Sequence, residues 1–430
     1  MKLDRPNLFT LAILSNVSAA LLTGRLSDSD TSSGRSPWPW PGTSDPQPDL
    51  PGRYVSFQDL HRCPSLTPKD DTPSSAKDVR PDDIKVIMAI GDSITVGFLA
   101  RPTSSSSSIL SIKEWRGLSY PIGGDEGAIT LPNILSRWSL TTGQSHSYIF
   151  DSRPKANTQH PLGVPPVPPS VSATSNWQDD LWTSYKGLNG AVSGSTSLSL
   201  YSQVRDYILP RLSKMNVSDT EWKFVNVGIG ANDICAFCLA PNSTLPLVGS
   251  PEEFAEGIKD AVDLLRKHVP RLIVNIIGLF KVSSLYALTL KNPYCKSIFL
   301  PPALPHLPLE CNCALLPGPV GDYTRRRMDD MSEAYDSAVL QVIKDWQQES
   351  DREFGVMWQP GSFIDLESWP IEALSPIDCF HPSEAAHQRV AAGLWNRLTM
   401  GLETKSRPIR WTEEVSVRCL EDDDRFGLGI

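Results

Sequence analysis

A serine, a carboxylate and a histidine of this chain stand in motifs that suit acyl transfer through a covalent intermediate. The apolar run 86–90 leads straight into Gly91-Asp92-Ser93, which is typical of a buried strand ending in a tight turn that presents a serine hydroxyl. A helix after this turn would place backbone N–H groups beside developing negative charge. Far along the chain, Asp378 precedes His381 by three residues, so one loop holds both. We expect His381 to take the Ser93 proton while Asp378 orients the imidazole.

Two glycine-rich segments supply candidate oxyanion donors. Gly194, in the segment 188–195, has no side chain to keep a substrate from its N–H, and Asn232 carries an uncharged amide donor just after a predicted strand. An ordinary glycine turn after a strand is the alternative interpretation of Gly194. His387 is the alternative functional histidine, but it falls in a helical pattern and is interpreted as a helix-face residue.

These residues stand in the order Ser93, Gly194, Asn232, His381, which resembles the four blocks of the SGNH, or GDSL, hydrolase superfamily. The resemblance implies the flavodoxin-like SGNH fold, with Ser93 as nucleophile, His381 as base and Asp378 as its orienting acid. It also implies an oxyanion hole made by the N–H of Ser93, the N–H of Gly194 and the amide of Asn232. Neither a metal nor an organic cofactor is required.

Several segments are similar to one branch of that superfamily, the phospholipase B lipases. They are residues 80–86, 115–125, 130–135, 230–235 and 378–381. This resemblance implies hydrolysis of acyl esters of (lyso)phospholipids or related lipids, with peripheral contact to lipid surfaces. Two alternatives stay open: an SGNH esterase acting on short acyl or acetylated carbohydrate esters, and a catalytically silent binding protein on the same fold.

Several features favour a secreted chain. Residues 1–24 combine basic residues, a short apolar stretch and small residues, which is the pattern of a signal peptide and too short for a transmembrane anchor. The eight cysteines favour disulfides over zinc ligation by Cys235-x-x-Cys238. Asn216 and Asn242 begin glycosylation sequons. The net charge of −9 argues against a nucleic-acid partner and mildly against binding by attraction to anionic lipid, so we expect contact with lipid to use apolar surface.

Short apolar runs alternate with amphipathic patterns along the chain. They predict parallel strands over 84–90, 223–229, 272–277 and 354–358, separated by helices with apolar stripes. We therefore expect a three-layer α/β/α sandwich whose site residues gather at the carboxyl ends of the strands. The predicted parts are a signal peptide (1–24), a Ser/Pro-rich linker or pro-region (25–78), the hydrolase domain (79–405) and a C-terminal tail (406–430) whose acidic run 421–424 is solvated.

Overall fold

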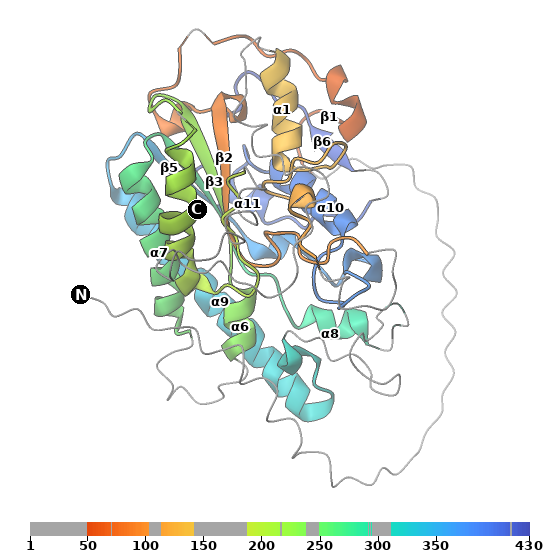
Figure 1. Ribbon diagram of the computed structural model, residues 1–430. Coiled ribbons are helices and arrows are strands. Elements are labelled where there is room, and N and C mark those ends of the chain that lie inside the picture. Colours follow the sequence, from red (N-terminus) through yellow and green to blue (C-terminus); the bar gives the residue numbers. More distant parts are fainter. Residues whose placement is uncertain are drawn as a thin grey trace, which may run out of the picture. The chain divides into compact units, whose positions relative to one another are not determined.

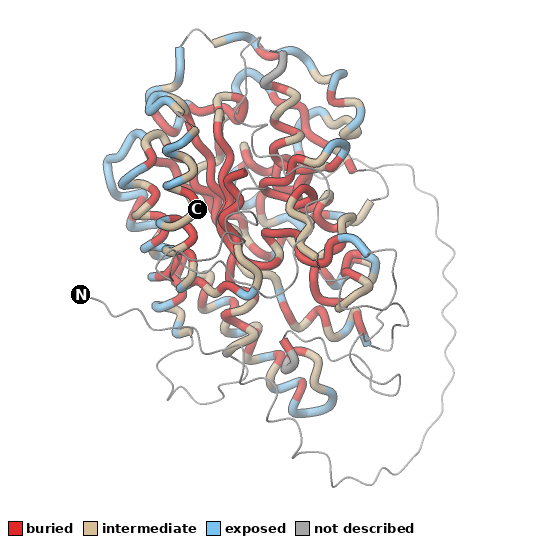
Figure 2. Tube along the Cα trace, in the orientation of Figure 1, coloured by how far each residue is buried: buried red, intermediate tan, exposed pale blue. Residues whose placement is uncertain are grey.

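Four parallel strands, in the order β2-β3-β4-β5, form the central sheet of the computed structural model (Figure 1). They are β2 (Ile84–Gly91), β3 (Trp222–Gly228), β4 (Leu272–Ile277) and β5 (Phe354–Gln359). Nearly all of their residues are buried on both faces, as Figure 2 shows. Runs of this kind need cover on both sides of a sheet, which explains why apolar residues continue without alternation. The four predicted strands are confirmed.

The structure describes residues 50–69, 71–102, 113–141, 187–215, 217–237, 249–290, 292, 294, 311–412 and 415–430. All of them lie in one unit, Pro46–Ile430. The predicted signal peptide 1–24 and the sequon residues Asn216 and Asn242 lie outside the described residues.

Helices lie on both sides of the sheet, so the three-layer α/β/α sandwich is confirmed. Helices α7 and α9 pack against each other on one side, and α1 and α10 on the other (Figure 1). The helices are α1 (Leu131–Thr141), α4 (Leu200–Ser202), α5 (Leu209–Leu212), α6 (Ala231–Phe237), α7 (Pro251–His268), α8 (Ser284–Thr289), α9 (Gly318–Gln348), α10 (Glu384–Trp395) and α11 (Leu402–Lys405). A π-helical turn, η7 (Gln203–Ile208), lies between α4 and α5.

Helix α7 illustrates how local sequence sets an element. Ser250 accepts the backbone N–H of Glu253, whose carboxylate accepts the Ser250 N–H, so a capping box starts the helix. Pro251 occupies the first helical position, where its missing N–H costs nothing. The apolar side chains of this helix from Phe254 to Leu265 form one buried stripe, as expected of a helix that covers the sheet.

Both edges of the sheet are extended by isolated bridges outside the named strands. Ala89 of β2 bridges Asn189 in parallel, and Met357 of β5 bridges Gly429 in parallel. The segment that leads to Gly194 therefore runs as a short edge strand beside β2, toward the carboxyl end of the sheet. The C-terminal residues run beside β5 in the same way.

The described N-terminal and C-terminal segments pair with each other beside the amino end of β2. Strand β1 (Tyr54–Ser56) is antiparallel to β6 (Ser416–Arg418), and a disulfide joins Cys63 to Cys419. Phe426 donates its N–H to the Val79 carbonyl, 3.1 Å away. The expected boundaries at residues 78 and 405 therefore do not coincide with the limits of the folded unit. The described parts of the expected linker and tail belong to it.

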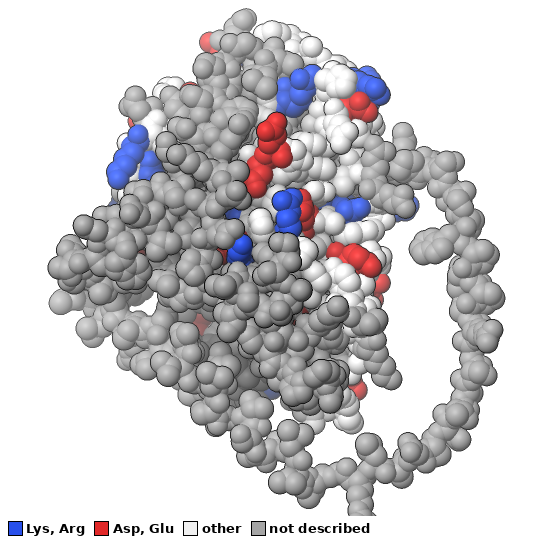
Figure 3. Space-filling view, turned by 45° about the vertical axis from the view of Figure 1, so that its right-hand side comes forward, with Lys and Arg blue, Asp and Glu red and all other residues white. Residues whose placement is uncertain are grey.

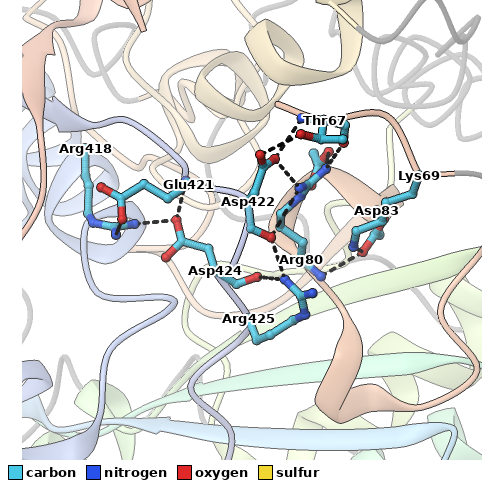
Figure 4. A network of polar contacts seen from close by, with 10 residues as sticks. Thr67, Lys69, Arg80, Asp83, Arg418, Glu421, Asp422, Asp424 and Arg425 are labelled. Atoms are coloured by element: carbon cyan, nitrogen blue, oxygen red, sulfur yellow. Dashed lines mark hydrogen bonds and ion pairs between the residues drawn. The ribbon is translucent and has the colours of Figure 1, made fainter. Parts of the chain in front are cut away.

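The acidic run 421–424 is more than solvated chain, which corrects the interpretation from sequence. Asp424 is buried against Arg418, with an Nη1–Oδ2 distance of 2.6 Å, and Asp422 binds Arg80 at 3.0 Å (Figure 4). Arg80, from a distant part of the chain, and Arg418, six residues before Asp424, hold the run in place, although residues 421–423 remain exposed. On the face in Figure 3, the described basic side chains lie among acidic ones.

Candidate active site

Ser93, His381 and Asp378, which the sequence motifs predict to act together, are in contact. The Oγ atom of Ser93 lies 2.8 Å from Nε2 of His381, and Nδ1 of His381 lies 2.5 Å from Oδ2 of Asp378. Ser93 is 3 % exposed and His381 0 %. With a proton on Nδ1 donated to Asp378, Nε2 is free to accept the Ser93 hydroxyl proton. Chemically, this arrangement suits a serine nucleophile with a base and an orienting acid.

The loop carrying Asp378 and His381 is closed by its own hydrogen bonds. Oδ1 of Asp378 accepts the N–H groups of Phe380 and His381 at 3.1 and 3.2 Å, leaving Oδ2 for the imidazole. Ser375 donates its N–H to the His381 carbonyl at 2.7 Å, and Cys379 donates to the Ser375 carbonyl at 2.9 Å. One carboxylate thus fixes both the loop backbone and the imidazole ring.

The turn after β2 differs from the prediction in two respects. Residues 93–97 form turns, with Phe98 donating its N–H to the Ser93 carbonyl at 3.0 Å, so the helix expected directly after the serine is not formed. The serine is also buried instead of exposed. Gly91 has φ +158°, and a Cβ there would lie 2.2 Å from the Gly228 carbonyl of β3. Only glycine allows this close approach.

Gly194 and Asn232 are joined through the residue that follows the glycine. Nδ2 of Asn232 donates to the Ser195 carbonyl at 2.9 Å, which leaves a second N–H on the same amide. Gly194 has φ +79°, with nothing within 4 Å of the place a Cβ would take, so glycine is needed there for backbone conformation. Val192 donates its N–H to the Gly91 carbonyl at 3.2 Å, which ties this loop to the turn that carries Ser93.

Gln203 is a buried side chain of the site that sequence reasoning missed. Its Oε1 accepts the Gly91 N–H at 2.9 Å, while its Nε2 donates to the Gly91 carbonyl at 2.8 Å and to Ser195 Oγ at 3.1 Å. Gln203 therefore links the serine turn to the Gly194 loop. It stands in no motif, and the sequence carries no signal for it.

Asp233, the neighbour of Asn232, also holds this loop. Its carboxylate accepts from the N–H and the hydroxyl of Ser197, at distances from 2.9 to 3.2 Å. Burial raises the pKa of Asp233 to about 6, and the Ser197 hydrogen bonds partly offset that rise. Asn232 and Asp233 together fasten the loop to the start of α6.

His387 lies on α10 but faces the core. It is 1 % exposed, its Nδ1 accepts the Tyr120 N–H at 3.4 Å, and its ring stacks on Tyr120 with centroids 5.9 Å apart. Burial, with a smaller contribution from nearby His381, lowers its pKa to about 3. His387 is therefore neutral at ordinary pH, and the imidazole that meets the Ser93 hydroxyl is that of His381.

Disulfides stand next to the candidate site. Cys235, three residues after Asn232, is bonded to Cys311, and Cys379, between Asp378 and His381, is disulfide-bonded as well. The disulfide interpretation of these cysteines is confirmed, which removes Cys235 as a zinc ligand. Cys238 and Cys295 lie outside the described residues. Within the described ranges, no group of three His, Cys, Asp or Glu side chains is placed to hold a metal ion.

Comparison with known proteins connects this geometry to a family. The profile of the GDSL-like lipase/acylhydrolase family matches residues 87–394. That match begins in β2, includes every candidate site residue and ends in α10.

Curated relatives match along most of the chain. The chain is 29 % identical over 386 residues to rat phospholipase B1, membrane-associated, and 28 % identical over 375 residues to the human protein of that name. These matches cover 87 % and 83 % of this chain but 23 % and 22 % of the relatives. The chain therefore spans less than a quarter of their length. Among the described residues, no helix has the length and apolar character needed to cross a bilayer.

Solved structures also match. A carbohydrate esterase family 3 protein from Talaromyces cellulolyticus is 12 % identical with a TM-score of 0.30, covering 71 % of this chain and 91 % of its own. A variant of an acetyl xylan esterase from Geobacillus stearothermophilus is 13 % identical with a TM-score of 0.30, covering 76 % of this chain and 100 % of its own.

Proposed function

Because the chain belongs to the GDSL-like lipase/acylhydrolase family, a class of carboxylic ester hydrolases, we propose that it cleaves acyl esters of (lyso)phospholipids or related lipids through a covalent acyl-enzyme. The observation that carries this proposal is the pair of contacts from Ser93 to His381 and from His381 to Asp378. The curated relatives named phospholipase B1 favour lipid esters as the substrate class.

The geometry suggests a sequence of proton transfers. His381 Nε2 takes the Ser93 hydroxyl proton as Oγ attacks the ester carbonyl, and Asp378 stabilises the imidazolium that forms. The carbonyl electrons move to oxygen, and we assign the N–H groups of Ser93 and Gly194 and the amide of Asn232 as donors to that oxyanion. His381 then gives its proton to the leaving alkoxide oxygen. Water attacks the acyl-enzyme by the same route and releases the fatty acid.

We also place the enzyme outside the cell. Bonded cysteines at both ends of the described unit suit an oxidising compartment, and residues 1–24 have the composition of a signal peptide. Contact with a lipid surface would use apolar side chains, because the chain is acidic overall. N-terminal sequencing of protein collected from the medium of expressing cells should begin close to residue 25. Retention inside the cells with an intact N-terminus would contradict this location.

The function is tested by fatty-acid release from phosphatidylcholine vesicles. The wild type should release fatty acid, and Ser93→Ala should lower the rate by about 10⁴-fold or more at unchanged thermal stability. Ser332→Ala is the matched control, because Ser332 is also buried but donates its hydroxyl only to the Met328 carbonyl within α9. That control should keep wild-type turnover.

The other outcomes separate the alternatives. Ser93-dependent cleavage of acetylated or short acyl esters without release from vesicles would move the substrate to non-lipid esters. If Ser93 neither supports hydrolysis nor reacts with a serine-directed phosphonate, the fold serves binding and not catalysis.

A further inference from the structure

A short segment, Lys113–Arg116, is hydrogen-bonded to the chain that follows the nucleophile. Leu99 donates its N–H to the Lys113 carbonyl at 2.8 Å, and Trp115 donates to the Gly97 carbonyl at 2.9 Å. These two hydrogen bonds flank an isolated antiparallel bridge that pairs Phe98 with Glu114. The 113–116 segment is thereby fixed to the residues that leave Ser93, and Phe98 itself packs edge-on against His381 at 4.7 Å.

From this segment, Arg116 reaches the chain that leads to Gly194. Its Nη1 donates to the Asn189 carbonyl at 3.1 Å and its Nη2 to the Ala191 carbonyl at 3.0 Å. Its Nε donates to Glu114 Oε2 at 2.9 Å, and the other oxygen of Glu114 accepts the Ser193 hydroxyl at 2.7 Å. Arg116 and Glu114 thus hold three alternate residues immediately before the glycine.

The alternation explains why a guanidinium is suited to this place. Ala89 donates its N–H to the Leu188 carbonyl, and Gly190 donates its N–H to the Ala89 carbonyl. The carbonyl of Leu188 and the N–H of Gly190 therefore face β2. In a strand the next carbonyls face the opposite way, and the carbonyls of Asn189 and Ala191 therefore point off the edge of the sheet. Arg116 supplies two parallel N–H donors to them, in the place where a further strand would supply backbone N–H groups.

We propose that Arg116, oriented by Glu114, is a positioning residue of the active site that holds the Gly194 N–H where the oxyanion forms. The proposal rests on the hydrolase function given above. On the near side of Gly194, Val192 also donates its N–H to the Gly91 carbonyl, and the backbone anchors beyond the glycine are the N–H of Ser195 on the Val192 carbonyl, at 3.1 Å, and Asn232 on the Ser195 carbonyl. Oxyanion donors stabilise the transition state only when held within a fraction of an ångström of their place. A released edge strand would shift the Gly194 N–H without removing it.

The effect should be visible in kcat and not in substrate binding. We expect Arg116→Gln to lower kcat on a soluble p-nitrophenyl ester by about 10- to 100-fold, less than the loss of a whole oxyanion donor. KM should stay within about threefold, because the displaced donor acts on the transition state. The rate of Ser93 labelling by a phosphonate should fall in parallel, since that reaction also develops charge on an oxygen in the same site.

Arg397 offers a matched control. It donates from Nη1 to the Gly393 carbonyl at 2.9 Å and from Nη2 to the Arg407 carbonyl at 2.7 Å, and it is 3 % exposed, so Arg397→Gln also removes two guanidinium–carbonyl bonds. Neither of its partners belongs to the active site. Arg397→Gln should lower the melting temperature while the folded protein keeps its kcat.

Rescue separates positioning from general structural support. Millimolar guanidinium, far below denaturing concentrations, should restore part of the kcat of Arg116→Ala and none of that of Ser93→Ala. Ser193→Ala removes only the hydroxyl bound by Glu114 and should lower kcat by about threefold to tenfold. If Arg116→Gln does not fold, Arg116→Lys and Ser193→Ala carry the test, because lysine keeps the charge but lacks the fork of two donors.

The results that overturn the inference are distinct from those that overturn the function. The positioning role alone would be excluded if the wild type shows Ser93-dependent turnover and folded Arg116→Gln keeps its kcat within twofold. Where Arg116→Gln does not fold, an unchanged kcat in folded Arg116→Lys and Ser193→Ala would exclude it in the same way. So would losses of kcat that match those of Arg397→Gln. If the wild type shows no Ser93-dependent hydrolysis of any ester, both proposals fail together.

Discussion

The two ends of the central sheet use charged side chains in different ways. Beside the amino end of β2, Arg80 binds Asp82 at 2.6 Å. Arg80 also binds Asp422 at 3.0 Å, and Arg418 binds Asp424 at 2.6 Å (Figure 4). At the carboxyl end, a single carboxylate binds an imidazole whose second nitrogen faces a serine hydroxyl.

The difference lies in whether the cation can release its proton. A guanidinium keeps its protons at any ordinary pH, so the pairs at the amino end fix chain segments and transfer nothing. An imidazole changes its charge near neutral pH, so the pair of Asp378 and His381 is able to move a proton. Contacts of similar length between a basic side chain and a carboxylate are therefore structural at one end of the sheet and catalytic, on our proposal, at the other.

The largest expected effect breaks the pair at the carboxyl end. Asp378→Asn keeps an oxygen for the N–H groups of Phe380 and His381, but its amide NH₂ would face Nδ1 and favour the wrong imidazole tautomer. We expect kcat to fall by about 10⁴-fold with little change in melting temperature. Steady-state kinetics and thermal unfolding of the same preparation would measure both. A folded Asp378→Asn enzyme with near wild-type kcat would exclude Asp378 as the orienting acid.

The next effect breaks the pairs at the amino end. Arg80 and Asp82 are 2 % and 5 % exposed in their side chains, so Arg80→Met would leave a buried carboxylate without its partner. We expect the free energy of unfolding to fall by about 3–5 kcal/mol, with kcat of the folded enzyme unchanged. Urea unfolding at neutral pH measures this loss. Arg80→Met/Asp82→Asn should recover part of it, and a loss below about 1 kcal/mol in the single variant would contradict the buried pair.

The contacts at these two ends also differ in how far they can be predicted from the sequence. Ser93, Asp378 and His381 are predictable because each stands in a local motif, and the strands are predictable because their apolar runs are continuous. Arg80 and Asp422 meet only after the chain has folded, since 342 residues separate them. Their pairing leaves no pattern in either segment, so the sequence alone favours a solvated acidic run.

Within the site, the residues that would perform the chemistry are recognisable from sequence, whereas the residues that hold the loops are not. The residue types that perform acyl transfer are few, which makes their motifs recognisable. The residues that hold the loops are ordinary side chains acting on backbone carbonyls, such as Gln203 on Gly91 and Arg116 on Asn189. Any of several polar residues satisfies a carbonyl, so composition and spacing do not reveal which one does.

A smaller effect compares how the two ends respond to acid. Burial raises the pKa of Asp233 from 3.8 to about 6, so between these values the folded state binds more protons than the unfolded state. Stability from this group is complete below about pH 4 and is lost as pH rises through 6. The contribution of Asp422 to stability changes with pH in the opposite direction. Hydrogen bonds from Thr67 and then the charge of Arg80 lower the pKa of Asp422, so this contribution is lost in acid.

Asp233→Asn should remove the first of these dependences. The asparagine oxygen keeps an acceptor for Ser197 and carries no charge to bury. We expect the stability of Asp233→Asn relative to wild type to grow by about 2 kcal/mol between pH 4 and pH 7. Urea unfolding across this range measures it. A constant difference between the two proteins at all pH values would show that Asp233 titrates normally in the folded state.

The smallest effect concerns the second buried histidine. An acid precedes each histidine by three residues, Asp378 before His381 and Glu384 before His387. Asp378 binds its histidine, whereas Glu384 is bound by Arg101, with an Nε–Oε2 distance of 2.6 Å. Burial without a carboxylate partner keeps His387 neutral, with a pKa of about 3.

His387→Gln should therefore change kcat by no more than about threefold and leave the pH dependence of kcat where it is, since no proton held by His387 titrates in the working range. A loss of melting temperature is expected, because the stacking on Tyr120 disappears. His381→Gln, measured beside it, should lose turnover by about 10⁴-fold or more. If instead the pH profile of His387→Gln shifts, the imidazole of His387 takes part in the proton transfers. A buried histidine beside the site would then take part in catalysis without a carboxylate to orient it.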